Sequence, residues 1–190
     1  MEIITAPDPR LRQKSTKVKV INDEVKDIIA KMTENSLEWE AKHPHELSAA
    51  MAAPQLGINR RIIIVRDDLD DKSNNHFTAL INPEVIRTDG KPVKDYEGCL
   101  SVPEIYGLVP RPKSAKIKAT LEDGTEVRIK ADNFLARTIL HEIDHLDGIL
   151  FIDHIKDEKD AFYRLNKNGD LVPLDYDENI KDNKDLFPDD

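Results

Sequence analysis

A short motif in the last third of the chain, His141-Glu142-Ile143-Asp144-His145, carries the residue types of a metal centre. On a helix, positions i and i+4 lie on the same face with Cβ atoms roughly 5–6 Å apart, so two imidazoles can chelate one divalent metal. The glutamate beside the first histidine then points toward the open side of the metal. Such a centre makes a hydroxide nucleophile from water near neutral pH. Because so short a motif also arises by chance on a charged helix, a third ligand has to be found.

The sequence downstream of the motif does not supply that ligand. In the pattern H-E-x-x-H-x-x-G-x-x-H the last position falls on Phe151, which cannot bind a metal, and His154 comes too late. Gly148 is instead predicted to end the helix in a left-handed conformation. Upstream, Cys99 is the candidate. A lone cysteine is usually a small buried hydrophobic residue, but beside a two-histidine helix its thiolate is a strong ligand, and Gly98 lets the backbone approach closely.

The surrounding pattern predicts the elements that position these residues. Asn22 caps a helix that runs to about Lys42, and a second helix, capped by Asp132 or Asn133, carries the two histidines. The buried stripe of the first helix is predicted to comprise Val25, Ile28, Ile29, Met32 and Leu37 or Trp39.

Short β-branched runs predict strands at 61–65 and 79–82, and the segment 92–111, which is punctuated by proline and glycine, is a loop or strand region. Residues 116–121 and 127–129 alternate around a turn at 122–124, which predicts a hairpin. Helices and strands are segregated along the chain, so the expected class is α+β.

Composition limits the possible functions. A chain of 190 residues suits one domain with a core, and its formal net charge of −9 shows no electrostatic footprint for nucleic acid. Cys99 is the single cysteine, which excludes an internal disulfide and suits a reducing compartment. No apolar run approaches the roughly 20 residues of a membrane span, and the N-terminus does not resemble a secretory signal. We therefore expect a cytoplasmic protein that does not bind membranes.

The C-terminal segment differs in character from the rest. Residues 153–190 contain twelve acidic and six basic residues, a net charge of −6 out of the total of −9. The pattern predicts a short helix around 157–165 and then a polar tail with a turn at 166–170, and such charge-rich ends are usually solvated or disordered. The expected organisation is a catalytic domain over 1–155 and an acidic extension over 156–190.

Three motifs follow one another along the chain: A-A-P-Q-x-G at 52–57, E-G-C-L-S at 97–101 and H-E-x-D-H-L-x-G at 141–148. Together they resemble peptide deformylase, and the resemblance covers residues 1 to about 155, including the arm at 7–12. It implies small mixed or antiparallel sheets packed around a central metal-binding helix. It also implies hydrolysis of the N-formyl group on the N-terminal methionine of newly synthesised polypeptides, which are the expected partners.

The resemblance implies a role for each matching residue. Cys99, His141 and His145 would hold one divalent metal with water as the fourth ligand; in the family this is Fe(II) in the cell, and zinc or nickel can occupy the site. Glu142 would be the general base. The side-chain amide of Gln55 and the backbone N–H of Leu100 would donate to the formyl oxygen as it becomes negative.

Further residues are expected to bind the peptide. Thr138 and Phe134 share one helical face with His141 and are candidates for the wall of a methionine pocket. The peptide backbone would pair by strand addition with edge groups near Ala50 and around Ile105-Tyr106-Gly107, close to Gly98. Glu97 and Arg111 either pair to fix the cysteine loop or form a surface ion pair of little consequence.

The chain also departs from the family pattern. Ser48 and Ala50 replace glycines of the first motif, and a Cβ at a positive φ would cost on the order of 1–2 kcal/mol and shift the loop. Leu140 replaces a common glutamine, which is a packing change. Two other functions stay open: a zincin-type endopeptidase, and a deformylase-like protein that binds formylated N-termini without turnover. A net-negative tail would be repelled by ribosomal RNA, so we expect the tail to do something else or nothing. Any proximity of the protein to the ribosome is expected to be transient.

Overall fold

The computed structural model describes residues 2–43, 46–68, 71 and 73–188, and it has the α+β class expected from the sequence. Its helices are α1 (Asp23–Lys42), α2 (Asn133–Leu146) and α3 (Tyr176–Asn179), with 3-10 turns η1 (Pro9–Arg12), η2 (Ala53–Leu56) and η3 (Phe151–Ile155). Its strands are β1 (Ala50–Ala52), β2 (Ile62–Arg66), β3 (Phe77–Cys99), β4 (Val102–Thr120), β5 (Glu126–Asp132), β6 (Phe162–Leu165) and β7 (Leu171–Pro173). They form one seven-stranded antiparallel sheet in the order β1-β2-β3-β4-β6-β7, with β5 paired to β4.

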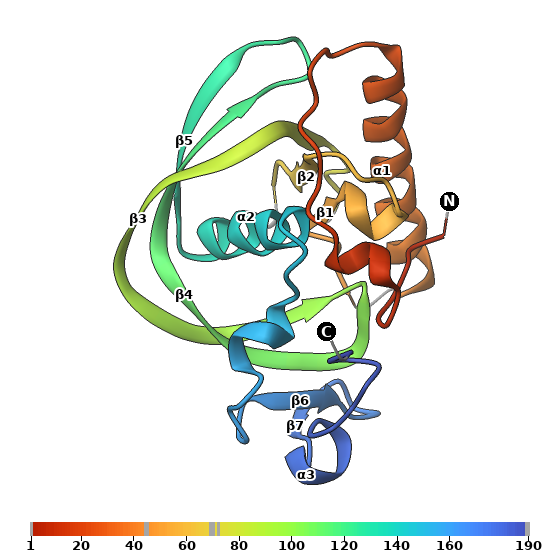
Figure 1. Ribbon diagram of the computed structural model, residues 1–190, viewed down its shortest axis with the longest axis vertical. Helices are drawn as coiled ribbons and strands as arrows, with labels where there is room; N and C mark the ends of the chain where they lie inside the picture. The colour runs from red at the N-terminus through yellow and green to blue at the C-terminus, as the bar shows by residue number, and fades with distance from the viewer. Residues whose placement is uncertain (1, 44–45, 69–70, 72, 189–190) are drawn as a thin grey trace.

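Two long strands give the sheet its shape. β3 and β4 pair along most of their length and curve around α2, which lies inside the bend (Figure 1). The segment 92–111, expected as loop or strand, is therefore strand apart from the turn at 100–101. Prolines are tolerated there because the ladder is interrupted: Pro92 follows a register shift after Asp89, and such bulges bend the strand.

Helix α2, which carries His141 and His145, is the centre of the main core. Its apolar residues pack against β2, β4 and β5, which buries the helix on nearly every side. Gly148 ends it at φ +77°, as predicted, and a Cβ there would lie 2.5 Å from the Arg12 backbone oxygen. The predicted N-cap position is confirmed, because Asp132 precedes the first residue of α2. Its side chain makes no capping hydrogen bond, however, and approaches Lys130 instead.

Helix α1 covers a second core cluster next to β1 and β2. The predicted stripe is confirmed for its first four residues, which are buried: Val25, Ile28, Ile29 and Met32. It is wrong for Leu37 and Trp39, which are only half-buried. The buried face continues through Ser36, because its small side chain packs against Met51, with the two heteroatoms 4.0 Å apart. Trp39 instead stacks on His43.

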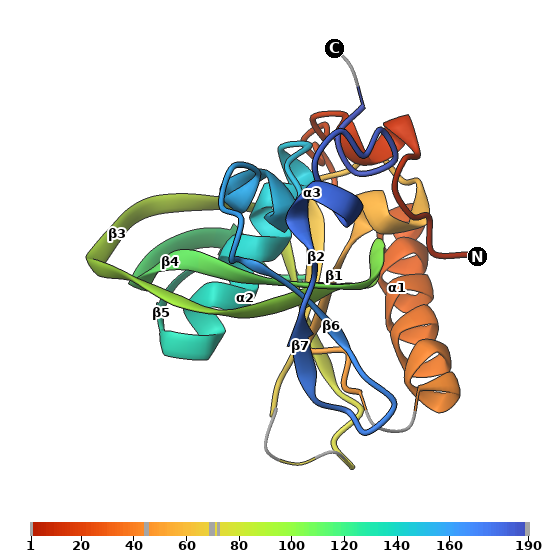
Figure 2. The same cartoon turned by 90° about the horizontal axis from the view of Figure 1, so that it is seen from below.

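The C-terminal segment is folded onto the sheet, contrary to expectation. In place of a helix at 157–165, β6 pairs with β4 through Tyr106 and Tyr163, and β7 completes a hairpin (Figure 2). The predicted turn at 166–170 is confirmed and closes this hairpin, with Gly169 at φ +84°. The predicted solvated tail is wrong because widely spaced apolar residues, Ile180 and Leu186 among them, are buried in a cluster with Phe151 while the charges stay outside. None of the helices described here is long and apolar enough to cross a membrane.

Candidate active site

Three side chains that are distant in sequence converge at one point. Cys99 comes from the end of β3, and His141 and His145 come from one face of α2. Their ligand atoms all lie within 4.8 Å of one another, and Cys99 Sγ is 3.1 Å from His145 Nε2. A thiolate and two imidazoles in this arrangement are a tetrahedral donor set with one position open. Cys99 thus lies where a third ligand could complete a metal site with the two histidines.

A buried carboxylate holds the first histidine in place. Glu97 accepts from His141 Nδ1 at 2.9 Å, so that the ring's Nε2 is free to face Cys99. Arg111 binds both oxygens of Glu97, at 2.8 and 3.0 Å, and is itself buried. Hydrogen bonds from these partners outweigh burial and hold the pKa of Glu97 well below its usual range. The Glu97–Arg111 pair is therefore formed, and it is a core ion pair and not a surface one.

Sequence reasoning missed Arg137, which belongs to the same network. Its Nη1 donates to Glu97 Oε1 at 2.6 Å and to the Val109 carbonyl at 2.8 Å, and its Nη2 donates to the Val93 carbonyl at 2.7 Å. Arg137 thus ties α2 to both long strands. The available signal was its position four residues before His141, which puts both side chains on one face of α2.

His154, rejected as a ligand from its spacing, lies outside the ligand group. Its Nε2 is 2.7 Å from Asp144 Oδ2, and the same oxygen accepts from Arg111 at 2.5 Å. Phe151, at the last position of the rejected pattern, is buried and stacks near the ring of His141 at 6.1 Å between centroids. His154 and Phe151 thus contact side chains of α2 without belonging to the ligand group.

Glu142 is buried beside the two histidines and lines the cavity. Burial raises its pKa to about 7, far above the ordinary value for a carboxyl group. Its Oε2 atom has no hydrogen-bond partner among the described residues. A carboxylate that is neither paired nor solvated, and that faces a cavity, is equipped to exchange a proton with a molecule bound there.

Gln55 reaches the same point from the 3-10 turn η2. Its Oε1 accepts the backbone N–H of Ala52 at 2.9 Å, which orients the amide. Its Nε2 therefore faces the ligand group, 3.7 Å from Cys99 Sγ and 3.3 Å from Ser101 Oγ. Leu100 lies in the turn between β3 and β4, directly after Cys99, and also lines the cavity.

A cavity of about 1070 Å³ opens in front of these groups. Of the residues expected to bind peptide, Gly107 does not line it, and the following do: Ala50, Gly98, Ile105, Tyr106, Phe134 and Thr138. Gly98 is required by a close approach, because a Cβ there would lie 2.7 Å from Cε1 of Tyr106. The Tyr106 hydroxyl donates to Glu46 Oε2 at 2.8 Å.

Two expectations about the cavity wall are wrong. The backbone at 105–107 is not an open edge, because Tyr106 pairs with Gly98 on β3 and with Tyr163 on β6. Of the strands near the ligand group, β1 pairs only with β2, which leaves its other edge open among the described strands. The backbone strain expected at Ser48 and Ala50 is absent, since neither residue has a positive φ. The Ser48 carbonyl accepts from buried Arg66 at 3.3 Å, a bond that any residue would make, and nothing in the structure explains the serine side chain.

A two-histidine helix completed by a cysteine, with a buried glutamate at the open side, defines a mononuclear metallohydrolase. Comparison with known proteins gives the family. The polypeptide deformylase family model matches residues 1–161. A peptide deformylase of Thermomicrobium roseum is 42% identical over 164 residues, covering 85% of this chain and 89% of the relative. One of Halothermothrix orenii is 41% identical over 155 residues, covering 82% and 93%.

Solved structures agree with the sequence matches. A peptide deformylase from Synechococcus elongatus, in complex with actinonin, aligns with a TM-score of 0.71 at 35% identity, covering 83% of this chain and 80% of that one. Peptide deformylase 1B of Arabidopsis thaliana, in complex with an inhibitor, aligns with a TM-score of 0.74 at 32% identity over 83% of each chain. The chain belongs to the polypeptide deformylase family.

Proposed function

We propose that Cys99, His141 and His145 hold one divalent metal, natively Fe(II), with zinc or nickel able to take its place. The donor set supports this, because one thiolate and two imidazoles suit late first-row metals far better than magnesium or calcium. The close approach of Sγ and Nε2 inside a buried site supports it too. When bound, the metal lowers the pKa of water so that hydroxide is available near neutral pH, and it polarises the formyl carbonyl.

The reaction is hydrolysis of the N-terminal formamide of a formyl-methionyl peptide, and Glu142 moves its proton. The carboxylate of Glu142 accepts a proton from the attacking water and delivers it to the amine nitrogen as the C–N bond breaks. Formate and a free N-terminus are the products. The unpaired Oε2 atom of Glu142, buried at the cavity beside the ligand group, is the observation that carries this assignment.

Gln55 and Leu100 stabilise the charge that develops on the formyl oxygen. The amide of Gln55 is held by Ala52 with its N–H₂ group toward the ligand group, so it needs no reorganisation during the reaction. The backbone N–H of Leu100 follows the cysteine ligand directly and supplies a second donor. Donors arranged in advance are worth more in a site that excludes water than they are in solution.

The substrate is proposed to be the formyl-methionine end of a nascent chain in the cytoplasm. Ala50 offers its backbone carbonyl to the formyl N–H from the open edge of β1. The methionine side chain packs against Thr138 and Phe134 on α2, while Tyr106, seated on Gly98, forms the opposite wall. Contact with the ribosome is transient. Residues 1–155 form the catalytic domain, and 156–190 extend it.

The proposal is tested by formate release from a formyl-Met tripeptide, using protein purified anaerobically with Fe(II) or with nickel added. Glu142→Gln keeps the shape of the site and removes the proton carrier, and we expect it to bind metal but to lose turnover. Glu122→Gln, in the exposed turn after β4, is the matched control and should retain full activity. A folded, metal-loaded wild type that releases no formate would refute the proposed function.

A further inference from the structure

The β6–β7 hairpin forms part of the wall of the active-site cavity. Arg164 and Lys167 of the hairpin, with their neighbours and Val172 of β7, line the same cavity as Cys99 and His141. The volume of about 1070 Å³ exceeds what most small-ligand sites provide, so there is room for residues beyond the first methionine. The hairpin lies beyond residue 161, where the family match ends.

Two cations on this wall differ from the other cations of the C-terminal segment. Lys159 and Lys181 pair with Asp177 at 3.4 and 3.6 Å, Lys156 lies over the Phe187 ring, and Lys184 has a partner as well. Arg164 and Lys167 are exposed, and within the described part of the chain neither side chain has an ion pair or a hydrogen bond. The two unpaired cations of an otherwise acidic segment are therefore the two that line the cavity.

Four carboxylates line the same cavity, and within the described part of the chain none of them pairs with Arg164 or Lys167. Glu97 is bound by Arg111 and by Arg137, and Glu46 accepts from the Tyr106 hydroxyl. Glu142 is buried at the ligand group. Glu104 is the remaining exposed carboxylate of the wall, against two cations. The hairpin residues that line the cavity thus contribute two positive charges and no negative one, in a protein whose formal charge is −9.

We propose that Arg164 and Lys167 select peptides that carry an acidic side chain downstream of the formyl-methionine. The inference rests on the proposed function, because the peptide must enter the cavity with its formyl group at the ligand group. A carboxylate on the emerging peptide would face the two cations, while a lysine or arginine there would be repelled. The contacts are exposed, so the effect is a graded preference and not an absolute requirement.

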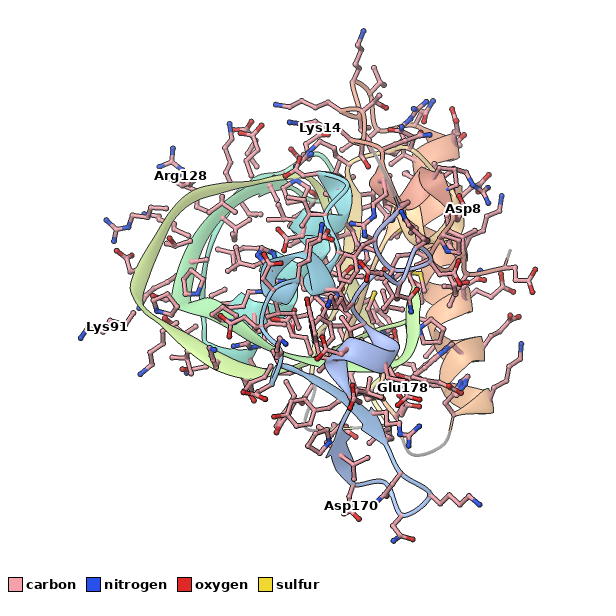
Figure 3. All side chains as sticks on the ribbon, turned by 60° about the horizontal axis from the view of Figure 1, so that its bottom comes forward. Asp8, Lys14, Lys91, Arg128, Asp170 and Glu178 are labelled. Carbon is pink, nitrogen blue, oxygen red and sulfur yellow. The ribbon has the colours of Figure 1, made fainter. Side chains whose placement is uncertain are left out.

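The test is a comparison of kcat/KM among formyl-Met-Ala-Ala-Ala-Ala amides with a single Asp, Asn or Lys at position three, four or five. The wild type is compared with the double variant Arg164→Gln/Lys167→Gln. The matched control, Lys91→Gln/Arg128→Gln, removes the same two residue types from β3 and β5. Figure 3 labels Lys91 and Arg128 there, well away from Asp170 at the hairpin tip. Amidated peptides remove the terminal carboxylate as a second source of negative charge.

At one or more positions the wild type should have a higher kcat/KM for the Asp peptide than for the Lys peptide. The hairpin variant should reduce the ratio of these two kcat/KM values by roughly threefold to tenfold. The control variant should keep the wild-type ratio. The preference should also fall at about 1 M salt, where the screening length is about 3 Å. A wild-type ratio near one, or equal ratios in the two double variants, would overturn the inference. Turnover of the Asn peptides in the same experiment would still support the deformylase reaction. No formate from any peptide would overturn both.

Discussion

Glu97→Gln is the substitution that most directly tests how the site is held together. The carboxylate accepts two hydrogen bonds from Arg111, one from Arg137 and one from His141, at 2.6–3.0 Å. Glutamine keeps the volume but removes the carboxylate charge that Arg137 and Arg111 share, which leaves Arg111 with its other partner, Asp144. Removing one partner of a buried ion pair costs about 3–5 kcal/mol. For a domain of this size that lowers the melting temperature by about 6–20 °C.

The same substitution should weaken metal binding. The outer hydrogen bond of His141 fixes which ring nitrogen is free for the metal, and loss of such partners costs about 10–100-fold in affinity. The assay is competition with a chelator of known affinity for Co(II) or Zn(II), followed by the absorption of the bound cobalt. Glu122→Gln is the isosteric control. Unchanged metal affinity in a folded Glu97→Gln protein would refute the argument that this network orients His141.

Three further changes have outcomes that the structure determines. Gln55→Ala should lower kcat by about 10²–10³-fold, with bound metal unchanged, because one donor to the formyl oxygen is lost; an effect confined to KM would contradict that role. Ile180→Ala should cost about 2–5 kcal/mol in urea unfolding because the side chain is fully buried, whereas a solvated tail would give a change within error. Gly148→Ala should destabilise by about 2–5 kcal/mol, since it combines a positive φ with a Cβ 2.5 Å from the Arg12 oxygen; wild-type stability would show that the arm moves aside freely.

Local chemistry accounts for what the sequence alone determined. The spacing of His141, Glu142 and His145 sets their geometry once a helix forms, and the apolar pattern around them makes that helix. The end of helix α2 at Gly148 could also be predicted from local sequence, because it depends on the conformation of one residue. The motif order added Cys99 and Gln55 to the site by resemblance, without any statement of distance.

The tertiary structure decided everything that depends on which distant segments meet. Arg137 reads in sequence as an ordinary helix cation, and only the position of β3 and β4 against α2 turns it into a partner of Glu97. The C-terminal segment looked solvated because its apolar residues are sparse and lack a helical or strand period over any long window. These apolar residues are buried because β6 pairs with β4 and brings the segment onto the sheet. Long-range pairing, which local propensity does not encode, thus shapes the outer wall of the cavity.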